Sequence, residues 1–192
     1  SVAACDAFRQ QGGTILLVTN SPRPRESVGR QLDGIGVARS AYDGIVSSGD
    51  VSRSLIDAWA GEPILHSGPE RDGPIVAGRL AAPGASVDDA AVAVCTGLYD
   101  DERETPADYA HILEHLKSRG VPMICANPDQ KVERGGRLIY CAGAIARAYE
   151  ALGGNVSYAG KPFQPIYDLA LEIGSDMRGK PVAKDRVLAI GD

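Results

Sequence analysis

The chain has 192 residues, of which 44% are hydrophobic and 23% charged, a composition typical of a soluble globular protein and untypical of a disordered one. Its formal net charge of −5, with Lys and Arg scattered along the sequence, disfavours nucleic acid as a partner. No apolar run approaches the roughly 20 residues of a membrane helix and no signal-peptide pattern opens the chain, so we expect no membrane partner and a cytoplasmic location.

The first half of the chain alternates helix and strand signals. The expected elements, in order, are a helix at 2–11, a strand at 14–19, a helix at 25–35, a strand at 44–47, a helix at 51–59 and a strand at 63–66. This alternation is typical of a doubly wound parallel sheet. A crossover helix normally follows a strand, so the helix that opens the chain predicts a strand before residue 1.

A Gly-, Pro- and Ala-rich stretch at 78–86 interrupts this rhythm and could be a linker. A second α/β set follows, with strands at 91–95 and 122–126 and helices at 106–119 and 141–152. A helix at 163–173 and a final buried strand at 187–190 close the chain. We therefore expect a core formed by residues 1–82 and 160–192, interrupted by an inserted α/β domain at 83–159.

Polar side chains stand where the strand at 14–19 ends, in "LLVTNSPRP". Thr19, Asn20 and Ser21 supply two hydroxyls and an amide just before an expected helix start, a combination that suits a phosphate. The alternative is structural, with Ser21 capping the helix and Asn20 stabilising a turn.

Two charged residues farther along could complete such a site. Lys161 lies between Gly160 and Pro162, just before a helix, where its ammonium could neutralise an anion; alternatively it is a solvated surface charge. Asp192 follows Gly191 at the end of an expected strand, as a Mg²⁺ ligand would. A Gly-Asp pair is also common in turns.

A competing motif lies in the helix expected at 106–119. His111, Glu114 and His115 match the H-x-x-E-H pattern of a class of zinc peptidases, because the two histidines share a helix face. The alternative is the solvated face of an amphipathic helix. The four cysteines form no Cys-x-x-Cys pair, which disfavours a zinc ribbon or a thioredoxin-like site, and each is expected to pack as a small apolar side chain.

Taken in order, the segments "ILLVTNSPRP", "MICANPD", "YCAGAIARAYEALGG", "AGKPFQPIYDLAL" and "RVLAIGD" resemble the haloacid dehalogenase (HAD) superfamily. They are most similar to its capped phosphatases of the NagD and phosphoglycolate phosphatase group, subfamily IIA. The resemblance implies an α/β fold with a HAD-like, Rossmann-type doubly wound parallel-sheet core and an inserted α/β cap domain of the C2 type.

The resemblance also implies roles for single residues. Thr19 and Asn20 would hold the transferring phosphoryl group, and Lys161 would stabilise its charge. Asp192 would help to hold Mg²⁺. Asn127 and Asp129, of the "NPD" segment, would face the active site and contribute to substrate choice.

The family's first motif, an Asp-x-Asp-like segment that bears the nucleophile, has no match in the printed sequence and would precede Ser1. We therefore expect a Mg²⁺-dependent phosphoric monoester hydrolase that acts through an aspartyl-phosphate on a small phosphorylated metabolite such as a sugar phosphate, with the printed chain itself inactive. A homodimer is a further expectation. The alternative is a non-catalytic HAD-like protein that binds phosphorylated metabolites.

Overall fold

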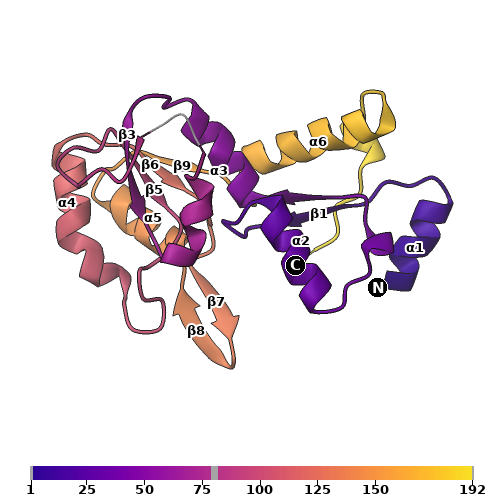
Figure 1. Ribbon diagram of the computed structural model, residues 1–192, viewed down its shortest axis with the longest axis horizontal. Helices are drawn as coiled ribbons and strands as arrows, with labels where there is room; N and C mark the ends of the chain where they lie inside the picture. The colour runs from indigo at the N-terminus through magenta and orange to yellow at the C-terminus, as the bar shows by residue number, and fades with distance from the viewer. Residues whose placement is uncertain (1, 79–81, 192) are drawn as a thin grey trace.

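The computed structural model describes residues 2–78 and 82–191 and arranges them in two lobes, each built around a parallel sheet (Figure 1). The smaller sheet pairs β1 (Leu16–Thr19) with β2 (Gly44–Ser47), and α2 (Arg25–Gly34) forms the crossover between them. Thr19 lies opposite Ser47 in the register, so both strands end at the same edge. The same lobe contains α1 (Val2–Gln10), the 3-10 helices η1 (Arg39–Ala41) and η4 (Lys184–Arg186), and α6 (Gln164–Arg178).

The larger sheet has five parallel strands in the order β4-β3-β5-β6-β9. These strands are β3 (Pro63–Ser67), β4 (Ala82–Pro83), β5 (Val92–Cys95), β6 (Met123–Cys125) and β9 (Val156–Tyr158). Every residue of β5 and β6 is buried, as expected for parallel strands covered on both faces. The helices around this sheet are α3 (Ser48–Asp57), α4 (Ala110–Ser118) and α5 (Ala142–Ala151), with the 3-10 helices η2 (Glu70–Ile75) and η3 (Pro106–Tyr109).

Alternate residues of β5 enter different cores. Ala93 and Cys95 face α4 and α5, whereas Val92 and Val94 face the side on which Ile56 of α3 packs. Helix α3 also contributes Val51 to the core beneath the smaller sheet. A capping box between Ser47 and Asp50 fixes its first turn. Through α3, the two lobes are therefore packed together (Figure 1).

A β-hairpin projects from the larger lobe (Figure 1). It pairs β7 (Lys131–Arg134) with β8 (Arg137–Tyr140) in antiparallel fashion. Gly135 and Gly136 connect the strands with φ angles of 58° and 76°, the two positive values that a tight hairpin turn requires. This hairpin was not among the elements expected from the sequence.

The α/β fold class is confirmed, and most expected elements are present within a few residues. Helix α3 begins three residues before the expected helix at 51–59, because the capping box starts at Ser47. The helix expected at 106–119 forms in two parts, η3 and α4. No helix in the described part of the chain is long and apolar enough to cross a membrane.

The prediction of a buried strand at 187–190 is wrong. These residues form no secondary structure, and the side chains of Val187, Leu188 and Ile190 are 50%, 82% and 90% exposed. A strand depends on hydrogen bonds to a neighbour, and no segment within the described ranges pairs with this one.

Strand β3 lies in the larger sheet although it belongs to the segment expected to form the first part of the core. It pairs with β5 of the expected insertion, and the boundary expected between residues 82 and 83 falls inside β4. Sheet membership alone does not define a domain. The division into 1–82, 83–159 and 160–192 therefore stays a prediction.

Candidate active site

The residues after β1 form a compact turn at the carboxyl edge of the smaller sheet. The Ser21 N–H donates to Thr19 Oγ1 at 3.2 Å, and the Arg23 N–H donates to Ser21 Oγ at 3.3 Å. Helix α2 begins later, with Pro24 as its N-cap and no capping side chain. Ser21 therefore orders the loop and does not cap the helix, contrary to the structural alternative.

The side-chain amide of Asn20 connects three segments. Its Oδ1 accepts the Lys161 N–H at 2.7 Å, and its Nδ2 donates to the Lys161 carbonyl at 3.1 Å and to Asp129 Oδ1 at 2.9 Å. All of its donor hydrogens are thus used. In this structure Asn20 positions other groups, and direct contact between Asn20 and a phosphoryl group stays a prediction.

Gly160 makes this close approach possible. A Cβ atom at this position would lie 2.6 Å from Asn20 Oδ1, 2.7 Å from Pro128 Cδ and 2.8 Å from Ser48 Oγ. Such contacts are well inside van der Waals separation, so glycine is needed for steric reasons.

Lys161 stands just before α6, as expected from the sequence. Its backbone is fixed by Asn20, and its side chain is half-buried. Among the described residues its ammonium group forms no hydrogen bond or ion pair, which leaves it available to an anion.

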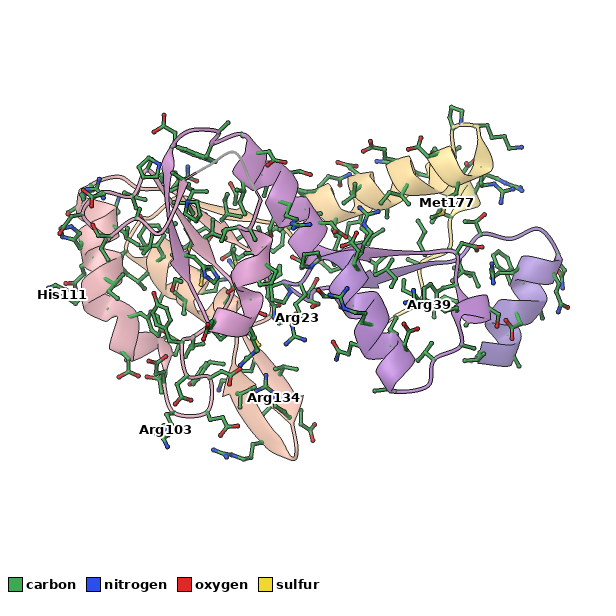
Figure 2. The ribbon with its side chains drawn as sticks, viewed as in Figure 1. Arg23, Arg39, Arg103, His111, Arg134 and Met177 are labelled. Carbon is green, nitrogen blue, oxygen red and sulfur yellow. The ribbon has the colours of Figure 1, made fainter. Side chains whose placement is uncertain are left out.

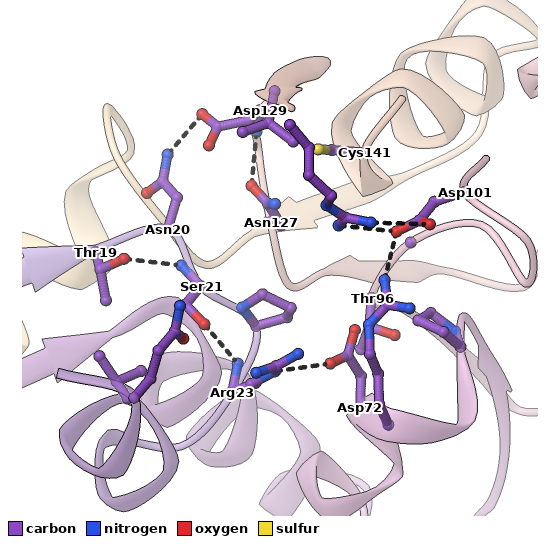
Figure 3. A pocket seen from close by; sticks show the side chains of 18 of the residues that line it. Thr19, Asn20, Ser21, Arg23, Asp72, Thr96, Asp101, Asn127, Asp129 and Cys141 are labelled. Atoms are coloured by element: carbon purple, nitrogen blue, oxygen red, sulfur yellow. Dashed lines mark hydrogen bonds and ion pairs between the residues drawn. The ribbon is translucent and has the colours of Figure 1, made fainter. Parts of the chain in front are cut away.

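A cavity of about 490 Å³ opens beside this turn (Figure 3). Five of the predicted site residues line it: Thr19, Asn20, Ser21, Asn127 and Asp129. The Asp129 N–H donates to Asn127 Oδ1 at 3.0 Å, which orders the "NPD" segment. Lys161 joins the group through its backbone contacts with Asn20, whereas Asp192 lies outside the described residues.

Arginine–carboxylate pairs, which were not expected from the sequence, also line the cavity. Asp101 accepts hydrogen bonds from Arg71 and from both terminal nitrogens of Arg134, at 3.2 and 3.1 Å for the latter. Burial alone would raise the pKa of Asp101, but the hydrogen bonds from Arg134 and Arg71 hold that pKa below its ordinary value.

Arg23 forms a second pair with Asp72, at 3.4 Å (Figure 3). The Asp72 side chain is only 5% exposed. No short-range motif marks either group, because the partners are 30 to 49 positions apart in the sequence.

The pKa shifts of two further residues, Cys141 on the wall and His66 near it, favour their uncharged forms. Burial raises the pKa of Cys141 to about 11, so this residue is a thiol at neutral pH and a poor nucleophile. His66 Nε2 lies 2.9 Å from Thr96 Oγ1, and burial lowers the pKa of His66 although nearby Asp72 opposes the shift.

The zinc-peptidase alternative finds no support in the geometry. His115 Nε2 lies 2.8 Å from Asp88 Oδ1, whereas His111 and Glu114 are exposed on α4, with His111 on the outer side of the larger lobe (Figure 2). Within residues 2–78 and 82–191, no group of three or more His, Cys, Asp or Glu side chains could hold a metal ion.

Comparison with protein-family models and with curated proteins gives no match. Among solved structures, a hydrolase of the haloacid dehalogenase-like family from Brucella suis 1330 is 51% identical, with a TM-score of 0.93 over 100% of this chain and 70% of that one. A possible sugar phosphatase of the HAD superfamily from Cytophaga hutchinsonii ATCC 33406 is 22% identical, with a TM-score of 0.74 over 96% of this chain and 68% of that one.

A glycerol phosphate phosphatase from Mycobacterium tuberculosis, solved in complex with magnesium, is 22% identical, with a TM-score of 0.65 over 84% of this chain and 49% of that one. These two more distant structures share the fold. The similarity to the Brucella suis protein covers the whole sequence at a high level of identity, and the chain therefore belongs to the haloacid dehalogenase-like family of hydrolases.

Proposed function

We propose that this protein is a Mg²⁺-dependent phosphatase that hydrolyses a small phosphate monoester. The observation that carries the proposal is the pair of hydrogen bonds between Asn20, the neighbour of Thr19 in the sequence, and the backbone of Lys161. Thr19 ends β1 and lines the cavity, and the adjacent Asn20 binds the backbone of Lys161. The reaction consumes water and a phosphate monoester and releases an alcohol and inorganic phosphate.

Thr19 and Lys161 supply complementary interactions for a phosphoryl group. Thr19 Oγ1 accepts a hydrogen bond from the Ser21 N–H, so its own hydroxyl hydrogen is free to be donated. The Lys161 ammonium adds a positive charge at the start of α6, where the helix dipole also favours an anion. In phosphoryl transfer, such positioning and charge stabilisation supply most of the rate acceleration.

Asn20 and Gly160 act through Lys161. Asn20 fixes the Lys161 backbone at both its N–H and its carbonyl, and Gly160 allows the two segments to approach. The ammonium therefore starts from an anchored backbone, which reduces the entropy lost when it binds phosphate.

The nucleophile and the metal ion are part of the proposal because the family resemblance implies them. The resemblance implies that an aspartate carries the phosphoryl group transiently, and no printed residue matches that motif. The described residues do not form a Mg²⁺ site by themselves. Asp192, outside the described ranges, is the expected ligand, and the Mycobacterium tuberculosis structure with magnesium supports the choice of ion. When bound, Mg²⁺ would neutralise charge on phosphate oxygens.

Asn127 and Asp129 are proposed to face the part of the substrate that leaves as the alcohol. The cavity of about 490 Å³ is of the size that binds small metabolites, and both residues line it. The segment 83–159 would act as a cap that excludes bulk water during the reaction. We also propose that the protein forms a homodimer, an arrangement that gel filtration would test.

The test combines binding with catalysis. Isothermal titration calorimetry is expected to show that the 192-residue chain binds inorganic phosphate. Lys161→Ala should weaken this binding. Lys180→Ala, the control at an exposed lysine beyond α6, should leave it unchanged. Hydrolysis of p-nitrophenyl phosphate by a form of the protein that carries the aspartate nucleophile should require Mg²⁺, stop with EDTA, and fall about a hundredfold or more in Lys161→Ala.

Equal phosphate affinity and equal turnover in the wild type and in Lys161→Ala would refute the site assignment. Clear turnover by the printed chain itself, abolished by Lys161→Ala, would instead refute the expectation that the chain as printed lacks its nucleophile.

A further inference from the structure

Two arginines on the cavity wall share a single carboxylate. Asp101, whose side chain is 12% exposed, binds Arg134 through two hydrogen bonds and Arg71 through one. We call these three residues the arginine cluster. Arg71 comes from η2 and Arg134 from the end of β7, and all three residues line the cavity.

The arginine cluster carries an excess positive charge. Asp101 is ionised and neutralises only one of the two guanidinium groups, so the cluster has a net charge of about +1. Of the other charged residues on the wall, Asp72 pairs with Arg23, whereas Asp129 accepts a hydrogen bond only from the neutral amide of Asn20 among the described residues and keeps its negative charge. The unmatched positive charge of the cavity wall therefore lies at Arg71 and Arg134, and its unmatched negative charge lies at Asp129.

Both guanidinium groups still have donors to offer. In its contacts with the described residues, Arg71 uses Nη2 on Asp101, and Arg134 uses one hydrogen on each terminal nitrogen. Their side chains are 44% and 52% exposed, so a ligand in the cavity can reach them. A guanidinium fork matches the paired oxygens of a carboxylate or a phosphate.

The cluster lies across the cavity from the proposed phosphate site. Thr19 and Asn20 mark one side of the close-up view and Asp101 the other (Figure 3). A small ligand whose phosphoryl group lies at Thr19 can therefore extend toward Arg71 and Arg134.

We propose that Arg71 and Arg134, held by Asp101, form a second anion subsite that selects phosphate monoesters carrying another acidic group on the leaving part. This inference rests on the proposed function for the orientation of the substrate. The shared chemistry is an anionic oxygen group, either a carboxylate or a second phosphate.

The experiment measures dissociation constants by calorimetry for two matched pairs of probes. The first pair is 3-phosphoglycerate and glycerol 3-phosphate, which differ in a carboxylate. The second is fructose 1,6-bisphosphate and fructose 6-phosphate, which differ in a phosphate. We expect the more acidic member of at least one pair to bind the wild-type chain about tenfold more tightly, and the pair that shows the preference identifies the acidic group.

Variants at the cluster should remove this preference. In the pair that shows the preference, Arg134→Gln is expected to reduce the ratio of the two dissociation constants to about one. Arg71→Lys keeps the positive charge but loses the planar guanidinium, and it should reduce the ratio partly. Arg137→Gln is the matched control, because Arg137 lies opposite Arg134 in the hairpin but does not line the cavity. It should leave the ratio unchanged.

The outcomes separate this inference from the proposed function. Equal affinities within both pairs, or a preference that survives in Arg134→Gln and Arg71→Lys, would overturn the second subsite. Lys161→Ala should weaken the binding of all four probes. If it weakens the binding of none of them while Arg134→Gln removes the preference, the phosphate site is wrong and the arginine subsite stands. Absence of binding by every probe would refute both. A purely structural arginine cluster would change stability without changing the ratio.

Discussion

Asn20 holds the backbone of Lys161 at two points, with its Oδ1 2.7 Å from the Lys161 nitrogen and its Nδ2 3.1 Å from the Lys161 carbonyl oxygen. The two residues are 141 positions apart in the sequence. This contact joins the end of β1 to the start of α6. The position of the Lys161 ammonium therefore depends on an amide that belongs to a different part of the chain.

Replacing this amide should weaken both folding and phosphate binding. Asn20→Ala removes three hydrogen bonds, and we expect the free energy of unfolding to fall by about 1–3 kcal/mol. Affinity for inorganic phosphate should fall as well, because Lys161 loses its anchor. Urea denaturation and calorimetry measure the two effects. Asn155→Ala, at an exposed position, is the control, and a phosphate affinity that stays at the wild-type value in Asn20→Ala would contradict the positioning role.

Gly160→Ala tests the steric argument at the same contact. The added Cβ would lie 2.6 Å from Asn20 Oδ1 and 2.7 Å from Pro128 Cδ, and we expect a loss of about 1–3 kcal/mol in unfolding free energy. Gly34→Ala, in α2, meets nothing within 4 Å and should be neutral or slightly stabilising. The midpoints of urea unfolding compare the two variants. If both behave alike, the close packing around Gly160 is not what the geometry indicates.

Asp101 should make folding stability sensitive to acid. Its pKa is lowered in the folded protein, so its contribution is fully present above the unfolded-state pKa of about 4 and is lost as the pH falls through the folded pKa. Asp101→Asn should therefore flatten the loss of stability below about pH 4. Unfolding free energies measured across that range give the comparison, with Asp185→Asn at an exposed position as the control. An unchanged acid profile in Asp101→Asn would argue against the ion pairs with Arg71 and Arg134.

Cysteine labelling should report burial. Cys95, Cys125 and Cys141 are buried, and burial raises the pKa of Cys95 to about 12 and that of Cys141 to about 11. Iodoacetamide at neutral pH should therefore modify the partly exposed Cys5 first and the other three only on unfolding. Mass spectrometry of native and urea-treated protein counts the adducts. Rapid native labelling of Cys141 would show that the cavity wall is more open than the structure indicates.

The sequence by itself determined the local features of this protein. The periodicity of apolar residues located β1, β2, β3, β5 and β6 and the helices around them. The polar residues at the end of β1 and just after it marked Thr19, Asn20 and Ser21 as a candidate site. These features depend on neighbouring residues, which a short stretch of sequence contains.

Only the tertiary structure decided which distant groups meet. The same apolar pattern gave a correct strand at 92–95 and a wrong one at 187–190, because a strand needs a partner for its backbone hydrogen bonds. Three contacts join residues at least 28 positions apart in the sequence. They are the pairing of β3 with β5, the hydrogen bond between Asn20 and Lys161, and the arginine cluster around Asp101. Such contacts follow from the packing of whole elements, and no local spacing in the sequence encodes them.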